Sequence, residues 1–196
     1  MNIEERRAMI VRAALPLLVE IGPSVTTLQI ARAAGISEPT IFRAFADKDE
    51  VLLACLDEAT KPENVLIELE AIDKEAGLEE RLTNLIDVIR LQGERTGAIM
   101  NAVRLAAPSK RRERSSLSDE EIRRLSESRT ASHQRIHSAV CSVLEPDEAR
   151  LRQPVTDIAT IVIGIVMSLG RARRMAGDMG ITTKQLEDLI MNGIVK

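Results

Sequence analysis

The side chains best suited to chemistry in this sequence are polar and basic residues grouped between Thr26 and Lys48. Hydroxyl and guanidinium groups at the start of a helix can hydrogen-bond to base edges in the major groove of DNA, and a nearby ammonium group can pair with a phosphate. A second group, His133, His137 and Cys141, has the four-residue spacing that places ligand atoms on one helix face. The first group indicates nucleic-acid recognition, and the second suggests metal chemistry as an alternative.

The stretch that contains the first group reads as two short helices separated by a tight turn, the pattern of a helix-turn-helix. Thr26 and Gln29 form a capping box that starts the first helix, and Gly35 supplies the left-handed residue that ends it. Ser37 is expected to cap the second helix, whose N-terminal residues would contact base edges. The predicted base-facing residues are Ser37, Glu38, Pro39, Thr40 and Arg43.

Each predicted contact has a chemical reason. Arg43 suits guanine or a phosphate, Thr40 suits a thymine methyl group, and Glu38 can accept a hydrogen bond from a cytosine amino group. An equal alternative for Glu38 is a carboxylate favoured by the helix dipole alone. Phosphate contacts are expected from Thr26, Thr27 and Lys48, which stand at helix N-termini.

Composition predicts an all-α protein without a membrane span. Tyr and Trp are absent, and helical spacing recurs along the whole chain. We expect a three-helix DNA-binding domain over residues 1–47 and a second helical domain over 48–196. Two cysteines and no signal peptide indicate a reducing cytoplasm. Basic and acidic side chains balance over residues 1–49, so weak non-specific DNA affinity is expected.

Several further helices can be placed from apolar spacing. Two separate helices are expected over 78–93 and 96–107, and a long helix is expected from 118 to 144. The segment 155–175 is apolar on most sides, so we expect it to be buried on most sides. Phe42 and Phe45, the only aromatic residues, are expected to face inward together.

The first fifty-odd residues resemble the TetR family of bacterial transcriptional repressors. The stretches that carry the resemblance are AALPLLVEIG, TTLQIARAAGIS, PTIFRAF and DKDEVLLACLDE. This chain departs from the family pattern at two positions, because the family often has Tyr where this chain has Phe42 and His where it has Ala44, and neither replacement can donate a hydrogen bond to a phosphate. Phe42 is kept among the predicted DNA-binding residues. The resemblance implies binding of double-stranded operator DNA by a homodimer, and release of that DNA when a small molecule binds the C-terminal domain.

These implied functions lead to two predicted residue sets. The last two helices are expected to form the dimer interface. Thr160, Gly164 and Ser168 are small and four residues apart, which would let another helix approach closely. The full predicted set is Thr160, Gly164, Met167, Ser168, Leu186, Leu189 and Ile190. A largely apolar small molecule is expected to contact Ile89, Ile99, Met100, Val103, His133, His137, Cys141 and Met167.

Two other functions remain alternatives from sequence. Three ligands from one straight helix rarely enclose a metal, so an all-helical metal-dependent enzyme is the least favoured, and we predict no catalytic residue, metal or cofactor. The neutral N-terminal domain, with Phe42 and Ala44, leaves a helical interaction module without DNA binding as the other alternative. The basic run at residues 110–114 is interpreted as a solvated loop in preference to a DNA-contacting arm.

Overall fold

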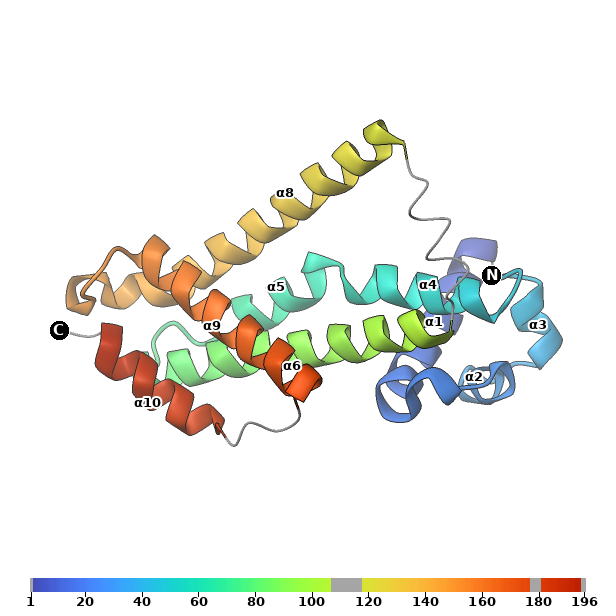
Figure 1. Ribbon diagram of the computed structural model, residues 1–196, viewed down its shortest axis with the longest axis horizontal. Coiled ribbons are helices and arrows are strands. Elements are labelled where there is room, and N and C mark those ends of the chain that lie inside the picture. Colours follow the sequence, from blue (N-terminus) through green and yellow to red (C-terminus); the bar gives the residue numbers. More distant parts are fainter. Residues whose placement is uncertain (1, 107–117, 177–180, 195–196) are drawn as a thin grey trace. The chain divides into compact units, whose positions relative to one another are not determined.

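The computed structural model describes residues 2–106, 118–176 and 181–194, and its regular elements are helices, which confirms the all-α prediction. The basic run at 110–114 lies outside the described residues. Figure 1 shows the elements in chain order: α1 (Ile3–Ile21), η1 (Gly22–Ser24), α2 (Thr27–Ala33), α3 (Glu38–Phe42), α4 (Lys48–Ala59), α5 (Pro62–Glu70), α6 (Leu78–Ala106), α8 (Asp119–Leu144), η2 (Glu145–Arg150), α9 (Val155–Ala176) and α10 (Thr183–Ile194).

The helices pack as two compact units, which are described separately. Unit 1 comprises residues 1–61 and 95–122, and unit 2 comprises residues 62–94 and 123–196. The expected helices over 78–93 and 96–107 are one continuous helix, α6, which contributes to both units. That expectation was wrong because Gly93 lies inside the helix and does not end it. The 1–47 boundary of the DNA-binding domain stays a prediction, and the packing unit that contains it is larger.

The core of unit 1 holds the helix-turn-helix against its neighbours. The side chains in this core come from α1, α2, α3, α4 and the end of α6, and the largest fully buried ones are Ile10, Leu18, Ile30, Ile41, Phe45, Leu52 and Ile99. Only one of the two aromatic residues is inward, because Phe45 is 2% exposed and Phe42 is 50% exposed. The expected inward pair is therefore corrected to a single buried ring and a surface ring at the end of α3.

The core of unit 2 joins α5, α6, α8, α9 and α10. Helix α9 buries Ile158, Val162 and Val166 in this core. Its opposite face is exposed, and only 28% of the window Val155–Ala172 is buried. The expectation that this helix is buried on most sides was therefore wrong for a single copy of the chain. Periodicity identified the apolar residues but not which of them another helix covers.

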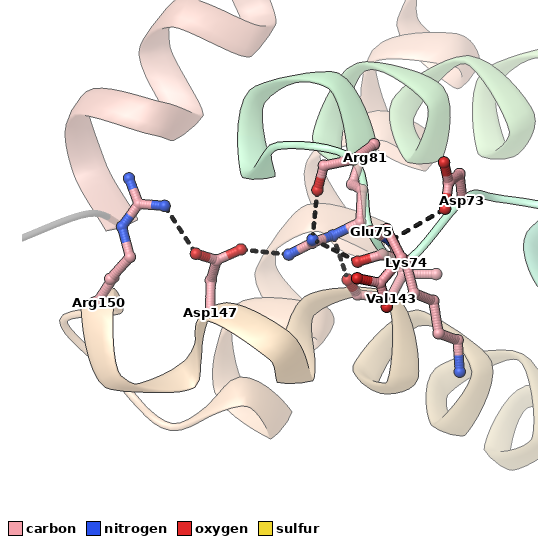
Figure 2. A network of polar contacts seen from close by, with 8 residues as sticks. Asp73, Lys74, Glu75, Arg81, Val143, Asp147 and Arg150 are labelled. Carbon is pink, nitrogen blue, oxygen red and sulfur yellow. Dashed lines mark hydrogen bonds and ion pairs between the residues drawn. The ribbon is translucent and has the colours of Figure 1, made fainter.

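A buried arginine links the start of α6 to the end of α8 within unit 2 (Figure 2). The Arg81 side chain donates to the carbonyl oxygens of Val143 at 3.0 Å, Lys74 at 2.9 Å and Ala76 at 2.6 Å. It also pairs with Asp147, whose other carboxylate oxygen accepts from Arg150 at 2.7 Å. Burial would raise the pKa of Asp147, but the hydrogen bonds and charges of the two arginines outweigh it and lower that pKa. Asp147 is therefore held ionised by its partners.

Candidate nucleic-acid interface

The turn between α2 and α3 has the geometry that its sequence predicts. The Thr26 hydroxyl accepts from the Gln29 amide at 3.2 Å, and the Gln29 side chain accepts from the Thr26 amide at 2.8 Å. Gly35 has φ of 68°, in the region that favours glycine, and the Ile36 amide donates to the Ala31 carbonyl at 3.0 Å. The capping box and the left-handed glycine are therefore confirmed.

The second helix of the motif begins as expected but is capped differently. Ser37 occupies the N-cap position of α3, yet its side chain makes no capping hydrogen bond to the backbone. Its hydroxyl instead lies 2.8 Å from the Thr40 hydroxyl. The expected Ser37 cap is thus corrected to a side-chain pair, because the Thr40 hydroxyl lies within reach one turn further on.

All nine predicted DNA-binding residues lie in α2 or α3, at the caps of these two helices, or at the start of α4 in unit 1. Ser37, Pro39, Phe42 and Arg43 are exposed, whereas Glu38 and Thr40 are half-buried. Pro39 and Phe42 belong to the short helix that a helix-turn-helix inserts into the major groove, and Ser37 and Arg43 are its two cap residues. The structure therefore brings the predicted base-facing side chains together on one element, and their contacts with DNA stay predictions.

Two predicted phosphate contacts already have partners inside the domain. The Lys48 ammonium group donates to the Pro23 carbonyl oxygen at 3.0 Å, and the Thr27 hydroxyl donates to a Glu38 carboxylate oxygen at 2.6 Å. An ammonium group has three protons, so Lys48 can keep its intramolecular bond and still approach a phosphate. Thr27 has one hydroxyl proton, and this proton is directed at Glu38.

Sequence reasoning missed Arg7, which holds the end of the motif in place from α1. Its guanidinium donates to the Ala44 carbonyl oxygen at 2.5 Å and pairs with Glu50 at 2.8 Å. It also lies 4.0 Å from the centroid of the Phe45 ring. These partners lie 37 to 43 positions after Arg7 in the chain. No short-range spacing in the sequence therefore predicts the contacts of Arg7. Arg7 thus links α1 to the segment that joins α3 and α4.

The residues predicted to bind a small molecule do not line one cavity among the described residues. Ile89 is buried in the core of unit 2, whereas Ile99 and Val103 are buried in the core of unit 1. Met100 and Met167 are exposed. A groove of about 780 Å³ is found elsewhere in unit 2, between α5 and α8, and none of the predicted residues lines it. Its buried lining includes Leu66, Leu69 and Val143, and its polar lining includes Glu70, Lys74 and Arg135.

His137 and Cys141 form a side-chain pair on α8. The Nε2 atom of His137 lies 3.1 Å from the Thr156 carbonyl oxygen and 3.0 Å from the Thr160 hydroxyl. Because a carbonyl can only accept, Nε2 carries the proton, and Nδ1 faces the Cys141 sulfur at 3.6 Å. Both ring nitrogens are therefore engaged within unit 2.

The neighbourhood of this pair gives no support to the enzyme alternative. Over residues 2–106, 118–176 and 181–194, no group of three His, Cys, Asp or Glu side chains is placed to hold a metal ion. Burial raises the pKa of Cys141, the backbone offsets this in part, and Glu145 raises the pKa further. A raised pKa keeps the thiol protonated, which does not favour a nucleophile.

These elements define a class: a helix-turn-helix domain on an all-α chain that presents a short recognition helix to solvent. Residues 10–55 match the family described as "Bacterial regulatory proteins, tetR family". The N-terminal part of the chain, which contains the helix-turn-helix, is therefore similar to the N-terminal domain of that family.

A curated relative supports the same domain assignment. The chain is 47% identical over 55 residues to the HTH-type transcriptional regulator HbdR of Aromatoleum sp. (strain CIB). The aligned segment covers 28% of this chain and 24% of that relative. The likeness therefore concerns the N-terminal domain and not the whole of either protein.

Solved structures share the fold over nearly the full chain. A transcriptional regulator structure from Rhodococcus sp. RHA1 is 15% identical, covers 96% of this chain and 94% of its own, and has a TM-score of 0.59. The crystal structure of superantigen PfiT is 23% identical, covers 100% of this chain and 99% of its own, and has a TM-score of 0.55. Because these structures are described under different functions, the likeness establishes the fold alone.

Proposed function

We propose that this protein is a DNA-binding transcriptional regulator that acts as a repressor in the bacterial cytoplasm. The observation that carries the proposal is the exposed recognition helix α3, with Ser37, Pro39 and Arg43 at the surface, inside the segment that matches the TetR family. The cap of α2, the Gly35 turn and the Arg7 bond to Ala44 fix the segments on either side of this helix. A preorganised helix loses little conformational freedom when it enters the groove.

Gel-shift titration against genomic fragments, including the DNA upstream of its own gene, tests the proposal. We expect specific retardation by the wild type and a loss of about 1–3 kcal/mol in binding free energy for Arg43→Ala. Arg123→Ala removes the same charge from an exposed position on α8 and serves as the control, with affinity unchanged. If no fragment is retarded, DNA binding is wrong and the interaction module becomes the better reading.

We further propose that two copies of the chain associate through α9 and α10. The exposed face of α9 carries the small residues Thr160, Gly164 and Ser168 beside the apolar Ile161 and Met167. By length and composition Val155–Ala172 could cross a membrane, but its opposite face packs in the core of unit 2. A second copy of the chain fits a face of this mixed character better than lipid does.

Helix α10 contributes one prominent side chain to the proposed dimer face. Leu189 is 69% exposed, whereas Leu186 and Ile190 are buried within their own chain. Burying an exposed Leu in each copy contributes about 1.5–3 kcal/mol per copy. We therefore expect Leu189→Glu to yield monomers in sedimentation equilibrium and to weaken DNA binding.

A control on α5 separates association from a general effect of surface charge. Ile67 is 66% exposed and lies outside α9 and α10. Ile67→Glu should leave the oligomeric state unchanged. If Leu189→Glu sediments like the wild type, the proposed dimer face is wrong.

For the effector we propose the α5–α8 groove, occupied by a molecule with an apolar body and an anionic end. Leu66, Leu69 and Val143 offer apolar contact, and Lys74 and Arg135 offer charge. Arg135 and Lys74 both line the groove; Arg135 pairs with Glu63 at 2.7 Å, and Lys74 donates to Ser142 at 2.7 Å.

Release of DNA by a panel of aliphatic carboxylic acids tests the effector site. Ser138 is exposed and lines the groove, so Ser138→Trp should fill it and abolish release while DNA binding persists. His133 is exposed on the same helix but does not line the groove, and His133→Trp is the matched control. If only His133→Trp abolishes release, the groove is wrong and the residues predicted from sequence regain support.

A further inference from the structure

One hydrogen bond connects the first residue of α2 with the first residue of α3. The Thr27 hydroxyl donates to Oε1 of Glu38 at 2.6 Å, and both side chains are half-buried. The direction of the bond follows from the chemistry, because an ionised carboxylate can only accept. One carboxylate oxygen of Glu38 therefore accepts from Thr27, and the carboxylate can still accept further hydrogen bonds.

This bond is not needed to build the helix-turn-helix. Thr26, not Thr27, caps α2 through its bonds with Gln29. The turn is set by Gly35 and by the hydrogen bond from the Ile36 amide to the Ala31 carbonyl. What the bond determines is the position of the Glu38 carboxylate, which would otherwise sample several rotamers.

The position of Glu38 is the one from which base edges are read. It is the first residue of the recognition helix and stands between two exposed residues, Ser37 and Pro39. In helix-turn-helix proteins the N-terminal residues of this helix contact base edges. A carboxylate near the phosphates is repelled unless it accepts a hydrogen bond, so its partner at this site must be a donor.

We propose that Thr27 and Glu38 form a base-reading pair, in which Thr27 positions the Glu38 carboxylate to accept from a cytosine amino group in each operator half-site. The proposal rests on the DNA binding proposed above and names the base that this residue selects. Thr27 acts as a positioning residue, and its hydroxyl contributes to sequence preference and not to a phosphate contact.

The choice of cytosine follows from the pattern of donors and acceptors in the major groove. Amino groups are offered there by cytosine N4 and adenine N6, whereas guanine N7 and O6 and thymine O4 are acceptors. Adenine N6 stands beside the acceptor N7 of the same base, which repels a carboxylate. Cytosine therefore offers the best partner, and guanine or thymine would leave a desolvated carboxylate facing an acceptor.

Selection of bound sequences from a random DNA library, followed by titration of the four operators that differ at the selected base pair, tests the proposal. The wild type should enrich one cytosine per half-site, with a preference of roughly tenfold per half-site over the other bases. Glu38→Gln should lose this preference or move it toward adenine, which glutamine can contact with two hydrogen bonds.

Variants at Thr27 distinguish positioning from a phosphate contact. Thr27→Val removes the hydroxyl at similar volume and should weaken the preference at the same base pair that Glu38→Gln affects. Thr27→Ser keeps the hydroxyl and should restore it, and in the Glu38→Gln background Thr27→Val should have little further effect on base preference. Thermal melting of each variant confirms that the domain is folded.

Three outcomes would overturn the proposal, and they separate it from the proposed function. If the wild type enriches no sequence, DNA binding itself is wrong and the base-reading pair is wrong with it. If the wild type enriches a site but Glu38→Gln keeps the same preference, only the base-reading pair is wrong. If Thr27→Val weakens all sequences equally and lowers the salt dependence, Thr27 is a phosphate contact.

Discussion

Replacing Arg81 by Met removes the buried donor that connects three segments of unit 2. Arg81 is 2% exposed, and its guanidinium serves the carbonyl oxygens of Val143, Lys74 and Ala76 as well as Asp147 (Figure 2). Met has a similar apolar length but no donor, so these acceptors lose their partner. A buried acceptor without a partner costs about 1–3 kcal/mol.

The expected loss of unfolding free energy is about 3–5 kcal/mol, the range for removing one partner of a buried ion pair. The simple sum over all acceptors would be larger, but Asp147 keeps its bond from Arg150, and its side chain is 13% exposed and can bond to water. For a chain of this length each kcal/mol lowers the melting temperature by about 2–4 °C, so a decrease of about 6–20 °C is expected.

Urea denaturation followed by far-ultraviolet circular dichroism measures this loss. Arg150→Met provides the control, because Arg150 binds the same carboxylate from a largely exposed side chain. An exposed ion pair contributes about 0–1 kcal/mol, so the control should remain close to the wild type. If Arg81→Met differs from Arg150→Met by less than about 1 kcal/mol, the buried network does not stabilise unit 2 and the reasoning is refuted.

Three further predictions concern titration, thiol reactivity and the α1 contact. The pKa of Asp147 is lowered in the folded state, so its contribution to stability is present above about pH 4 and is lost as the pH falls below that value. In urea denaturation at a series of pH values, Asp147→Asn should therefore show a smaller loss of unfolding free energy in acid than the wild type. Burial, with a smaller effect from Glu58, raises the pKa of Cys55 to about 12, so maleimide labelling of the native protein should modify the partly exposed Cys141 first, and equal rates would contradict this. Arg7→Ala should cost about 1–3 kcal/mol in thermal melting, with partial recovery in Arg7→Lys, and unchanged melting would show that Arg7 does not hold the segment between α3 and α4.

Local features of the fold could be predicted because their causes lie within a few residues. The capping box Thr26–Gln29 forms with the expected reciprocal bonds, and Thr182 and Gln185 form the same pair at the start of α10. Gly35 adopts the left-handed conformation because glycine has no Cβ atom, so no contact with a distant helix is needed to favour it.

Burial was predicted less well, because a helical period does not say which neighbour covers an apolar face. Phe42 and Phe45 are three residues apart, yet only Phe45 meets the core of unit 1. Leu186, Leu189 and Ile190 were all expected at the dimer interface, yet Leu186 and Ile190 are buried within their own chain and only Leu189 is exposed. In each case the arrangement of other helices decides which edge of the apolar stripe is covered.

The contacts that give the candidate site its character were beyond prediction. Thr27 and Glu38 were each placed near DNA for separate reasons, and nothing in their spacing showed that they bond to each other across the turn. The sequence also did not predict that Ile89 and Ile99 lie in two different cores. Both residues are on α6, which is one continuous helix that contributes to both units.

By itself the sequence determined the all-α class, the capping boxes and the helix-turn-helix, because capping, glycine conformation and periodic apolar spacing act between neighbours in the chain. Only the tertiary structure decided which carboxylate Thr27 positions, which acceptors Arg81 serves and which face of α9 is left uncovered. These depend on the distances between side chains remote in the chain, which are set by packing and not by any local pattern.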